Sequence, residues 1–164
     1  MKNSIVLIGM PGVGKSTVGV ILAKILGYRF IDTDIVIQEH ENKLLKDIIS
    51  SEGIDGFIEK ENRIISELKA EKAVIATGGS VIYGADAMKN LSGMGTVIYL
   101  KLDYRKLRYR LGNISNRGVV IRKGQKLSDL YNERCPMYER YADIIIDENG
   151  RNIEKTIEKI LEYI

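Results

Sequence analysis

Five short apolar runs rich in Ile and Val recur along the chain, and most of them lack alternation between apolar and polar positions. They are Ser4–Ile8, Arg29–Asp32, Ala73–Ala76, Thr96–Leu102 and Ile144–Asp147. Uninterrupted apolar runs of this length are typical of strands that are buried on both faces of a parallel sheet. The pattern therefore predicts a short parallel sheet of about five strands.

The segments between these runs have the spacing of amphipathic helices. Helices are expected at Lys15–Leu26, at Asp34–Ser51 with a break near Asn42, and at Ile54–Ala70, Asp103–Leu111, Lys126–Tyr138 and Ile153–Tyr163. Strands that alternate with helices form right-handed βαβ crossovers, so helices cover both faces of the sheet. The expected fold class is a three-layer α/β/α fold, formed by residues 1–164 as a single domain.

Composition and charge narrow the class of protein further. The chain has 164 residues, of which 45% are hydrophobic and 29% are charged, and this suits a globular domain and excludes wholesale disorder. No apolar run approaches the ~20 residues that span a membrane. A net charge of +3 is too small to indicate nucleic-acid binding. The lone cysteine, Cys135, allows no internal disulfide, so we expect a cytoplasmic protein. From the apolar runs and the net charge, we expect neither membrane nor nucleic-acid partners.

The most specific motif follows the first apolar run. Residues 9–16 read Gly-Met-Pro-Gly-Val-Gly-Lys-Ser and match the phosphate-binding loop (P-loop), G-x-x-x-x-G-K-[ST], between a strand and a helix. Glycines let backbone N–H groups curl around phosphate oxygens, and the following helix adds its positive end. In such a loop Lys15 reaches the β- and γ-phosphates, and Ser16 ligates Mg²⁺. The expected nucleotide-binding residues are Gly12, Val13, Gly14, Lys15, Ser16 and Thr17, and the fold is a P-loop NTPase fold.

Two acids end the second apolar run. P-loop enzymes need a carboxylate near the loop to hold the metal, and the usual acid is missing after Ala73–Ala76. Residues two apart in an extended segment point to the same side, so Asp32 and Asp34 are both expected to face the P-loop. One acid can hold Mg²⁺ while the other orients an acceptor hydroxyl or takes its proton. The alternative is that Asp34 only caps the following helix.

Two further features indicate where an acceptor binds. Gly78 and Gly79 follow the third apolar run and allow a ligand to approach the backbone at the carboxyl ends of the strands. Glu61 lies on the apolar stripe of the helix expected at Ile54–Ala70, where a buried carboxylate needs a partner. It either takes part in the site or reaches solvent from the edge of the stripe.

Together these motifs resemble those of the shikimate kinases, and the resemblance covers nearly the whole chain. It rests on the P-loop, on Asp32-Thr-Asp34, on Thr77-Gly-Gly-Ser80, and on the segment from Arg134 to Asp143, Arg-Cys-Pro-Met-Tyr-Glu-Arg-Tyr-Ala-Asp. The family fold includes a mobile lid, here at about residues 112–125. The resemblance implies transfer of the γ-phosphate of ATP to the 3-hydroxyl of shikimate, with Mg²⁺ bound.

The resemblance also implies roles for individual residues. Lys15, Asp34 and Arg117 are the expected catalytic residues, and Ser16 and Asp32 are the expected Mg²⁺ ligands. Nucleotide binding gains three arginines: Arg110, Arg117 and Arg151. The expected substrate-binding positions are Asp34, Ile58, Glu61, Gly78, Gly79 and Arg134. The partner is a small molecule, and the protein is expected to be a monomer.

The departures from the family cluster on the acceptor side. The family has Phe-Arg where this chain has Phe57-Ile58, and that Arg clamps the substrate carboxylate. The lid motif Arg-Pro-Leu reads Arg-Gly-Val at residues 117–119, and Ser80 adds a side chain to the glycine turn. Glu61 matches a family Glu near the substrate-binding arginines, so its partner here is either Arg134 or the substrate.

Two alternatives to a shikimate kinase stay open from the sequence. Ile58 favours a kinase for another small polyol, sugar acid or alcohol. A nucleotide-binding regulatory domain without turnover is the other alternative, although Lys15 and Asp34 argue against it. Residues 101–126 hold nine basic residues and one acidic residue, and a basic lid opposite a P-loop suits a polyphosphate substrate in either kinase.

Overall fold

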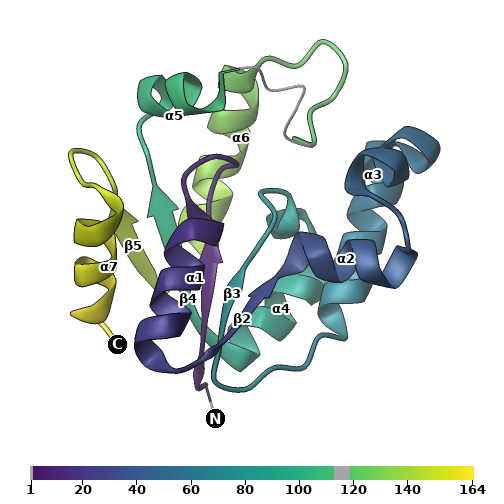
Figure 1. Cartoon of the computed structure of the whole chain (residues 1–164). Helices are drawn as coiled ribbons and strands as arrows, with labels where there is room; N and C mark the ends of the chain where they lie inside the picture. Colours follow the sequence, from purple (N-terminus) through teal and green to yellow (C-terminus); the bar gives the residue numbers. More distant parts are fainter. Residues whose placement is uncertain (1, 113–118) are drawn as a thin grey trace.

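The computed structural model describes residues 2–112 and 119–164, which form one parallel sheet flanked by helices (Figure 1). The strands are β1 (Ser4–Ile8), β2 (Arg29–Asp32), β3 (Ala73–Ala76), β4 (Gly95–Lys101) and β5 (Ile144–Asp147). They lie in the order β2-β3-β1-β4-β5, and every neighbouring pair is parallel. The five predicted strands are confirmed, with β4 beginning and ending one residue earlier than expected.

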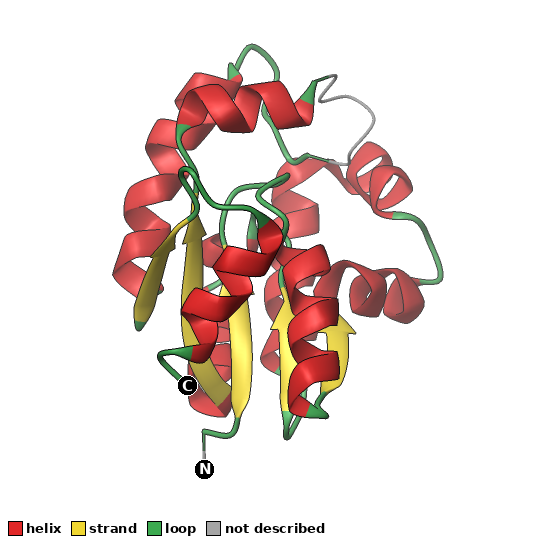
Figure 2. Cartoon of the chain, turned by 60° about the vertical axis from the view of Figure 1, so that its left-hand side comes forward, coloured by secondary structure: helices red, strands yellow, loops and turns green. Residues whose placement is uncertain are grey.

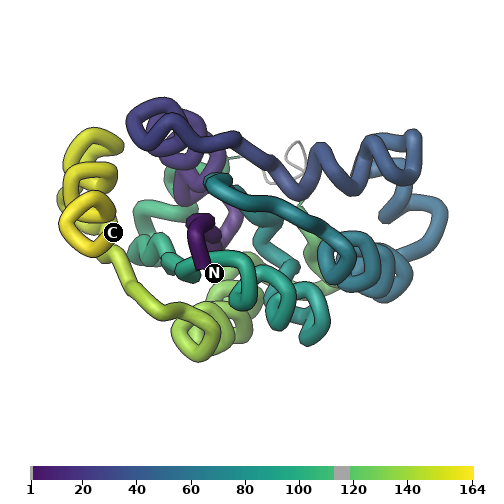
Figure 3. Tube along the Cα trace, turned by 90° about the horizontal axis from the view of Figure 1, so that it is seen from below, coloured from purple at the N-terminus to yellow at the C-terminus, as the bar shows by residue number. Residues whose placement is uncertain are grey.

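Helices cover both faces of this sheet, as the sequence predicts (Figure 2). They are α1 (Lys15–Leu26), α2 (Thr33–Glu41), α3 (Leu45–Ser66), α4 (Ala85–Met94), α5 (Tyr104–Leu111), α6 (Leu127–Tyr141) and α7 (Ile153–Leu161), with a short 3₁₀ turn η1 (Val81–Tyr83). Seen from below, α1 and α7 lie together on one side, and α4 and α6 lie on the other (Figure 3). The three-layer α/β/α fold is therefore confirmed.

The central strands explain the unbroken apolar runs. Every residue of β1 and of β3 is buried, because each of these strands has a neighbour on both edges and helices on both faces. All five strands point the same way, so their carboxyl ends meet at one edge of the sheet (Figure 1). Loops at such an edge form the binding crevice of open α/β sheets.

The helical region between β2 and β3 differs from its prediction in detail. The expected break near Asn42 is present, since α2 ends there with a left-handed Asn42 (φ 52°). A second interruption is a kink inside α3 at Gly53, whose φ of 74° and ψ of 175° are not helical. It falls in the gap between the two expected helices. The second part of α3 ends at Ser66, four residues before the predicted end at Ala70.

Helix α4 was not predicted, because its sequence holds a glycine near its end, has glycines on both flanks and has a buried face of only three residues. Contacts with the α3 region stabilise it: Asn62 Oδ1 on α3 accepts a 2.9 Å hydrogen bond from Ala87 N, and Asn90 Nδ2 on α4 donates to the carbonyls of Ile65 and Leu68. Tertiary contacts therefore override a weak local pattern. Within residues 2–112 and 119–164, no helix combines the length and apolar character that crossing a bilayer requires.

Candidate active site

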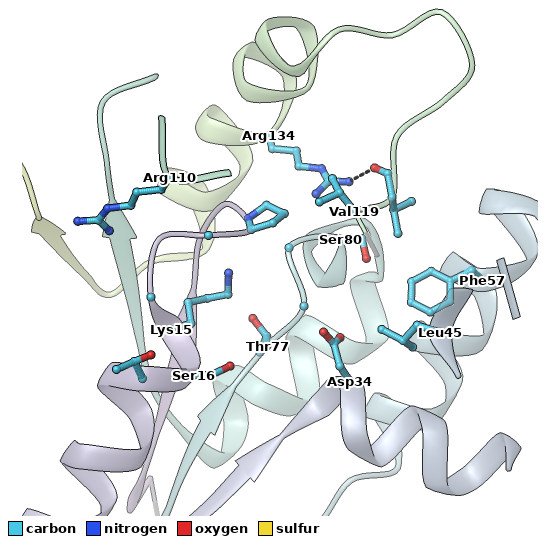
Figure 4. A pocket seen from close by; sticks show the side chains of 17 residues that line it. Lys15, Ser16, Asp34, Leu45, Phe57, Thr77, Ser80, Arg110, Val119 and Arg134 are labelled. Atoms are coloured by element: carbon cyan, nitrogen blue, oxygen red, sulfur yellow. Dashed lines mark hydrogen bonds between the residues drawn. The ribbon is translucent and has the colours of Figure 1, made fainter. Parts of the chain in front are cut away.

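A cavity of about 680 Å³ opens at the carboxyl ends of the strands, between the P-loop and helices α2, α3, α5 and α6 (Figure 4). It brings together most of the residues that the sequence assigned to the site: Gly12, Gly14, Lys15, Ser16, Thr17, Asp34, Gly78, Gly79, Arg110 and Arg134. Five assigned residues do not line it: Val13, Asp32, Ile58, Glu61 and Arg151. Arg117 and the rest of residues 113–118 of the expected lid lie outside the described residues.

The P-loop has the backbone that its glycines allow. Gly12 (φ 84°) and Gly14 (φ 100°) are in the left-handed region, which residues with a side chain rarely adopt. The ammonium of Lys15 donates to the carbonyls of Gly9 (2.7 Å) and Met10 (2.9 Å). Burial lowers the pKa of Lys15 to about 8, although Asp34 opposes this shift. Lys15 is therefore held by the loop itself, close to where phosphates bind.

Asp32 ties the second strand to the P-loop. Its Oδ2 accepts a 3.0 Å hydrogen bond from Ser16 Oγ, and its Oδ1 accepts one of 3.0 Å from Asp34 N. Asp32 is thus the N-cap of α2, and the alternative in which Asp34 serves only as the cap is wrong. The chain is already helical from Thr33 onward, so the expectation of an extended Asp32–Asp34 segment is also wrong.

Asp34 instead lies in the first turn of α2 with its carboxylate directed into the cavity (Figure 4). Burial and the nearby Asp32 carboxylate together raise the pKa of Asp34 to about 6, while Lys15 acts in the opposite direction. A carboxylate whose pKa is closer to neutrality is a better proton acceptor than an ordinary aspartate. Asp34 therefore has both the position and the basicity of a general base.

The glycine turn after β3 leaves no room for further side chains. A Cβ on Gly78 would stand 2.7 Å from Asp34 Oδ1 and 3.1 Å from Glu61 Oε2. The turn is also fixed by hydrogen bonds on both sides: Gly78 N donates to Thr33 Oγ1 (3.1 Å), and Tyr138 Oη donates to the Gly79 carbonyl (2.6 Å). The backbone of this turn can therefore approach a ligand closely and in one orientation.

Arg134 is almost fully buried on α6, with an exposed fraction of 1%. Its Nη2 donates to the Val120 carbonyl (2.8 Å), drawn as a dashed line in Figure 4, and its Nε donates to Tyr83 Oη (3.3 Å). Glu61 makes no hydrogen bond to Arg134 among the described residues. The partner of Glu61 is Ser80, whose hydroxyl donates to Glu61 Oε1 at 2.7 Å.

Two of the expected nucleotide-binding arginines differ in their position. Arg110 lines the cavity and donates from Nη1 to the Val13 carbonyl (3.2 Å), so it contacts the P-loop directly. Arg151 is exposed and donates from Nε to the Asp147 carbonyl (2.9 Å) at the end of β5. Nearby Glu148 is buried, and burial raises the pKa of its carboxyl to about 7.

Sequence reasoning missed the residues that position these groups. Tyr83 and Tyr138 hold Arg134 and the glycine turn, and Leu45 and Phe57 form an apolar wall on the α3 side of the cavity (Figure 4). Tyr138 was detectable, because it lies four residues after Arg134 and hence on the same face of a helix. The apolar wall left no signal, since its members look like ordinary core residues.

Comparison with known sequences gives a consistent result along the chain. The family model described as "Shikimate kinase" matches residues 11–164. A shikimate kinase of Histophilus somni is 38% identical over 99% of this chain and 95% of its own length. One from Francisella tularensis subsp. holarctica is 36% identical over 99% of this chain and 94% of its own.

A solved structure has the same fold throughout. The shikimate kinase of Acinetobacter baumannii, in complex with shikimate, superposes with a TM-score of 0.89 at 33% identity. The alignment covers 98% of this chain and 92% of that one. The likeness therefore extends over the sheet, the P-loop and the helices that surround the cavity.

Proposed function

The chain belongs to the shikimate kinase family, and on that premise we propose how its site transfers the γ-phosphate of ATP to shikimate. It is an ATP-dependent kinase that phosphorylates a hydroxyl group of this small acceptor. The observation that carries the mechanism is that a single cavity joins the P-loop to Asp34, the glycine turn and Arg134. A phosphate donor and a carboxylated alcohol can therefore be held side by side.

The nucleotide end binds the phosphates mainly through backbone. The N–H groups of residues 12–17 and the positive end of α1 surround the β- and γ-phosphates. Lys15 exchanges the carbonyls of Gly9 and Met10 for phosphate oxygens and neutralises the charge that builds up during transfer. Arg110 and Arg151 hold the adenine, and Arg117 closes from the lid onto the phosphates.

Ser16 and Asp32 suit a magnesium ion. Their Oγ and Oδ2 atoms lie 3.0 Å apart beside the P-loop, and hydroxyl and carboxylate oxygens are the donors that Mg²⁺ prefers. When bound there with ATP, Mg²⁺ would neutralise charge on the phosphate oxygens. Asp32 then has two tasks, because it caps α2 as well as facing the metal.

The acceptor end orients the hydroxyl for attack. Asp34 accepts a hydrogen bond from the 3-hydroxyl of shikimate and takes its proton as the O–P bond forms. Arg134 and the backbone of Gly79 hold the substrate carboxylate. The apolar side chains of Leu45, Phe57 and Val119 exclude water, which would otherwise compete as phosphate acceptor.

We also propose that the protein acts as a cytoplasmic monomer whose 164 residues form one domain. The P-loop, Asp34, the glycine turn and Arg134 all line one cavity of a single chain. No second copy is needed to complete the proposed set of contacts.

A coupled assay of ADP release, with ATP, Mg²⁺ and shikimate, tests the proposed function. We expect turnover that depends on shikimate and saturates with it. ADP release only with other alcohols would indicate a different acceptor. ATP binding without turnover on any alcohol would indicate a regulatory domain, and either of these results would contradict the proposal.

A further inference from the structure

The Glu61–Ser80 pair lies directly behind the acceptor end of the cavity. Ser80 lines the cavity, whereas Glu61 lies behind it on α3 with an exposed fraction of only 1%. The Ser80 hydroxyl donates to Glu61 Oε1 at 2.7 Å. The second oxygen, Glu61 Oε2, is buried and has no hydrogen-bond partner among the described residues.

The surroundings of Glu61 disfavour its negative charge. Across Gly78 it faces Asp34 on α2, another carboxylate, while Arg134 on α6 contributes a weaker attraction and makes no hydrogen bond to it. An ionised carboxylate with one unpartnered oxygen in the interior is costly. Burial accordingly raises the pKa of Glu61 to about 7, although the Ser80 hydrogen bond acts in the opposite direction.

Protonation of Glu61 changes the direction of the Ser80 hydrogen bond. An ionised Glu61 can only accept, so the Ser80 proton points at Oε1 and the lone pairs of Ser80 face the cavity. A protonated Glu61 must donate, and Ser80 Oγ, 2.7 Å from Oε1, is the acceptor within reach among the described residues. The Ser80 proton is then released toward the cavity as a donor.

A carboxylate ligand requires the arrangement in which Glu61 is protonated and the Ser80 hydroxyl donates toward the cavity. Arg134 Nη1 lies 3.0 Å from where a Cβ on Gly79 would stand, so the guanidinium and Ser80 flank the same stretch of backbone. A carboxylate held there by Arg134 meets lone pairs of Ser80 when Glu61 is ionised and a hydroxyl donor when Glu61 is protonated. Ile58 does not line the cavity and has no charge to contribute.

We propose that Ser80 is a specificity-determining residue for the carboxylate of shikimate, and that Glu61 is a positioning residue whose proton makes the Ser80 hydroxyl a donor. In the pH range where Glu61 is ionised, binding of shikimate therefore takes up one proton. An O–H bond forms on Glu61 as a buffer acid gives up its proton, and no other covalent bond changes. This inference rests on the proposed function, because it takes shikimate as the ligand of the cavity.

Isothermal titration calorimetry with shikimate tests the inference without catalysis. Titrations in buffers of different ionisation enthalpy measure proton uptake, which we expect to approach about one proton per shikimate at pH 8 and to fall toward zero at pH 6. The dissociation constant should rise with pH, by up to about tenfold per unit above pH 7. The Asp34 and Lys15 charges also titrate in this range, so the contribution of Glu61 is the difference between wild type and variant.

Two variants and a matched control isolate that contribution. Glu61→Gln should lower the proton uptake at pH 8 by about one proton per shikimate and flatten the pH dependence of binding, because the amide does not titrate. Ser80→Ala should weaken binding at pH 6.5 by roughly tenfold, the loss of one hydrogen bond to a charged group, and remove the pH dependence. Glu148→Gln removes another buried carboxyl of raised pKa, on the nucleotide side, and should leave the proton uptake unchanged.

The outcomes separate the inference from the proposed function. Shikimate binding and turnover with no proton uptake at pH 8, or with uptake that is not lowered in Glu61→Gln, would overturn the inference and leave the function standing. If Glu61→Gln does not fold, as judged by its circular dichroism, Ser80→Ala and the wild-type uptake still decide the matter. Absence of both binding and turnover with shikimate would overturn the proposed function, and the inference with it.

Discussion

The two ends of the cavity are built in different ways. At the nucleotide end, one contiguous stretch, residues 9–17, supplies most of the described lining, including a single lysine, and Arg110 adds to it from α5. The acceptor end gathers side chains and backbone from α2, α3, the turn after β3 and α6. A short motif is therefore sufficient for the first end, whereas the second depends on how four segments pack.

The buried charges of the two ends differ accordingly. The Lys15 ammonium is buried but donates to two loop carbonyls. The Glu61 carboxyl is equally buried and has one oxygen without a partner among the described residues. The Lys15 ammonium is therefore satisfied by the loop before any ligand binds, whereas the proposed proton on Glu61 would complete the hydrogen bonds at the acceptor end.

Replacement of Lys15 by Met, at the nucleotide end, should have the largest effect on kcat. The methionine keeps most of the volume but removes the charge, so kcat should fall by about 10²–10³ or more, the loss expected for one group that stabilises transition-state charge. The coupled assay measures it. Lys24→Met, on the exposed side of the same helix, is the control and should keep kcat. A Lys15→Met enzyme with near-normal kcat would remove the P-loop lysine from the mechanism.

Replacement of Asp34 by Asn should impair the acceptor end and leave ATP binding at the nucleotide end unchanged. The amide cannot take the proton of the acceptor hydroxyl, so kcat should fall by about 10²-fold, the lower end of what a general base contributes, while ATP affinity is retained. Steady-state kinetics and equilibrium ATP binding measure these two quantities. Glu39→Gln removes an exposed carboxylate from the same helix and should change neither. A kcat close to that of the wild type in Asp34→Asn would falsify the acceptor role of Asp34.

Introduction of an arginine by Ile58→Arg should lower KM for shikimate at the acceptor end. A guanidinium three residues before Glu61 can pair with it or with the substrate carboxylate, and a charge-assisted hydrogen bond gives about a tenfold lower KM for shikimate. Pairing with Glu61 would also keep that carboxyl ionised and remove its proton uptake. Glu59→Arg adds positive charge at an exposed neighbouring position and is the control. An unchanged KM in an active Ile58→Arg enzyme would argue against a substrate carboxylate beside α3.

Replacement of Tyr138 by Phe should have the smallest effect. It leaves the half-buried Gly79 carbonyl without its 2.6 Å hydrogen bond, which costs about 1 kcal/mol, or about 3 °C in Tm. KM for shikimate should rise a few-fold because the turn loses its anchor. Tyr131→Phe, on the same helix, loses a similar bond to the Leu102 carbonyl and should lower Tm without a change in KM. Equal KM values in the two variants would mean that Tyr138 only stabilises the fold.

The limits of sequence prediction follow the same division. The P-loop, its flanking strand and α1 were predictable with their bounds, because glycine spacing and apolar periodicity are local signals. The Ser16–Asp32 hydrogen bond and the Ser80 partner of Glu61 were not, since those contacts join segments 16 and 19 residues apart. Helix α4 was missed for a related reason, because the contacts that stabilise it join it to the α3 region.

The most direct test of the account follows the phosphoryl group itself. A mixture of the enzyme, ATP, Mg²⁺ and shikimate, observed by ³¹P NMR, reports where the γ-phosphate goes. The account predicts that a phosphomonoester of shikimate, at its 3-hydroxyl, appears in equal amount to ADP. Accumulation of inorganic phosphate in place of the ester, or an unchanged ATP spectrum, would contradict it.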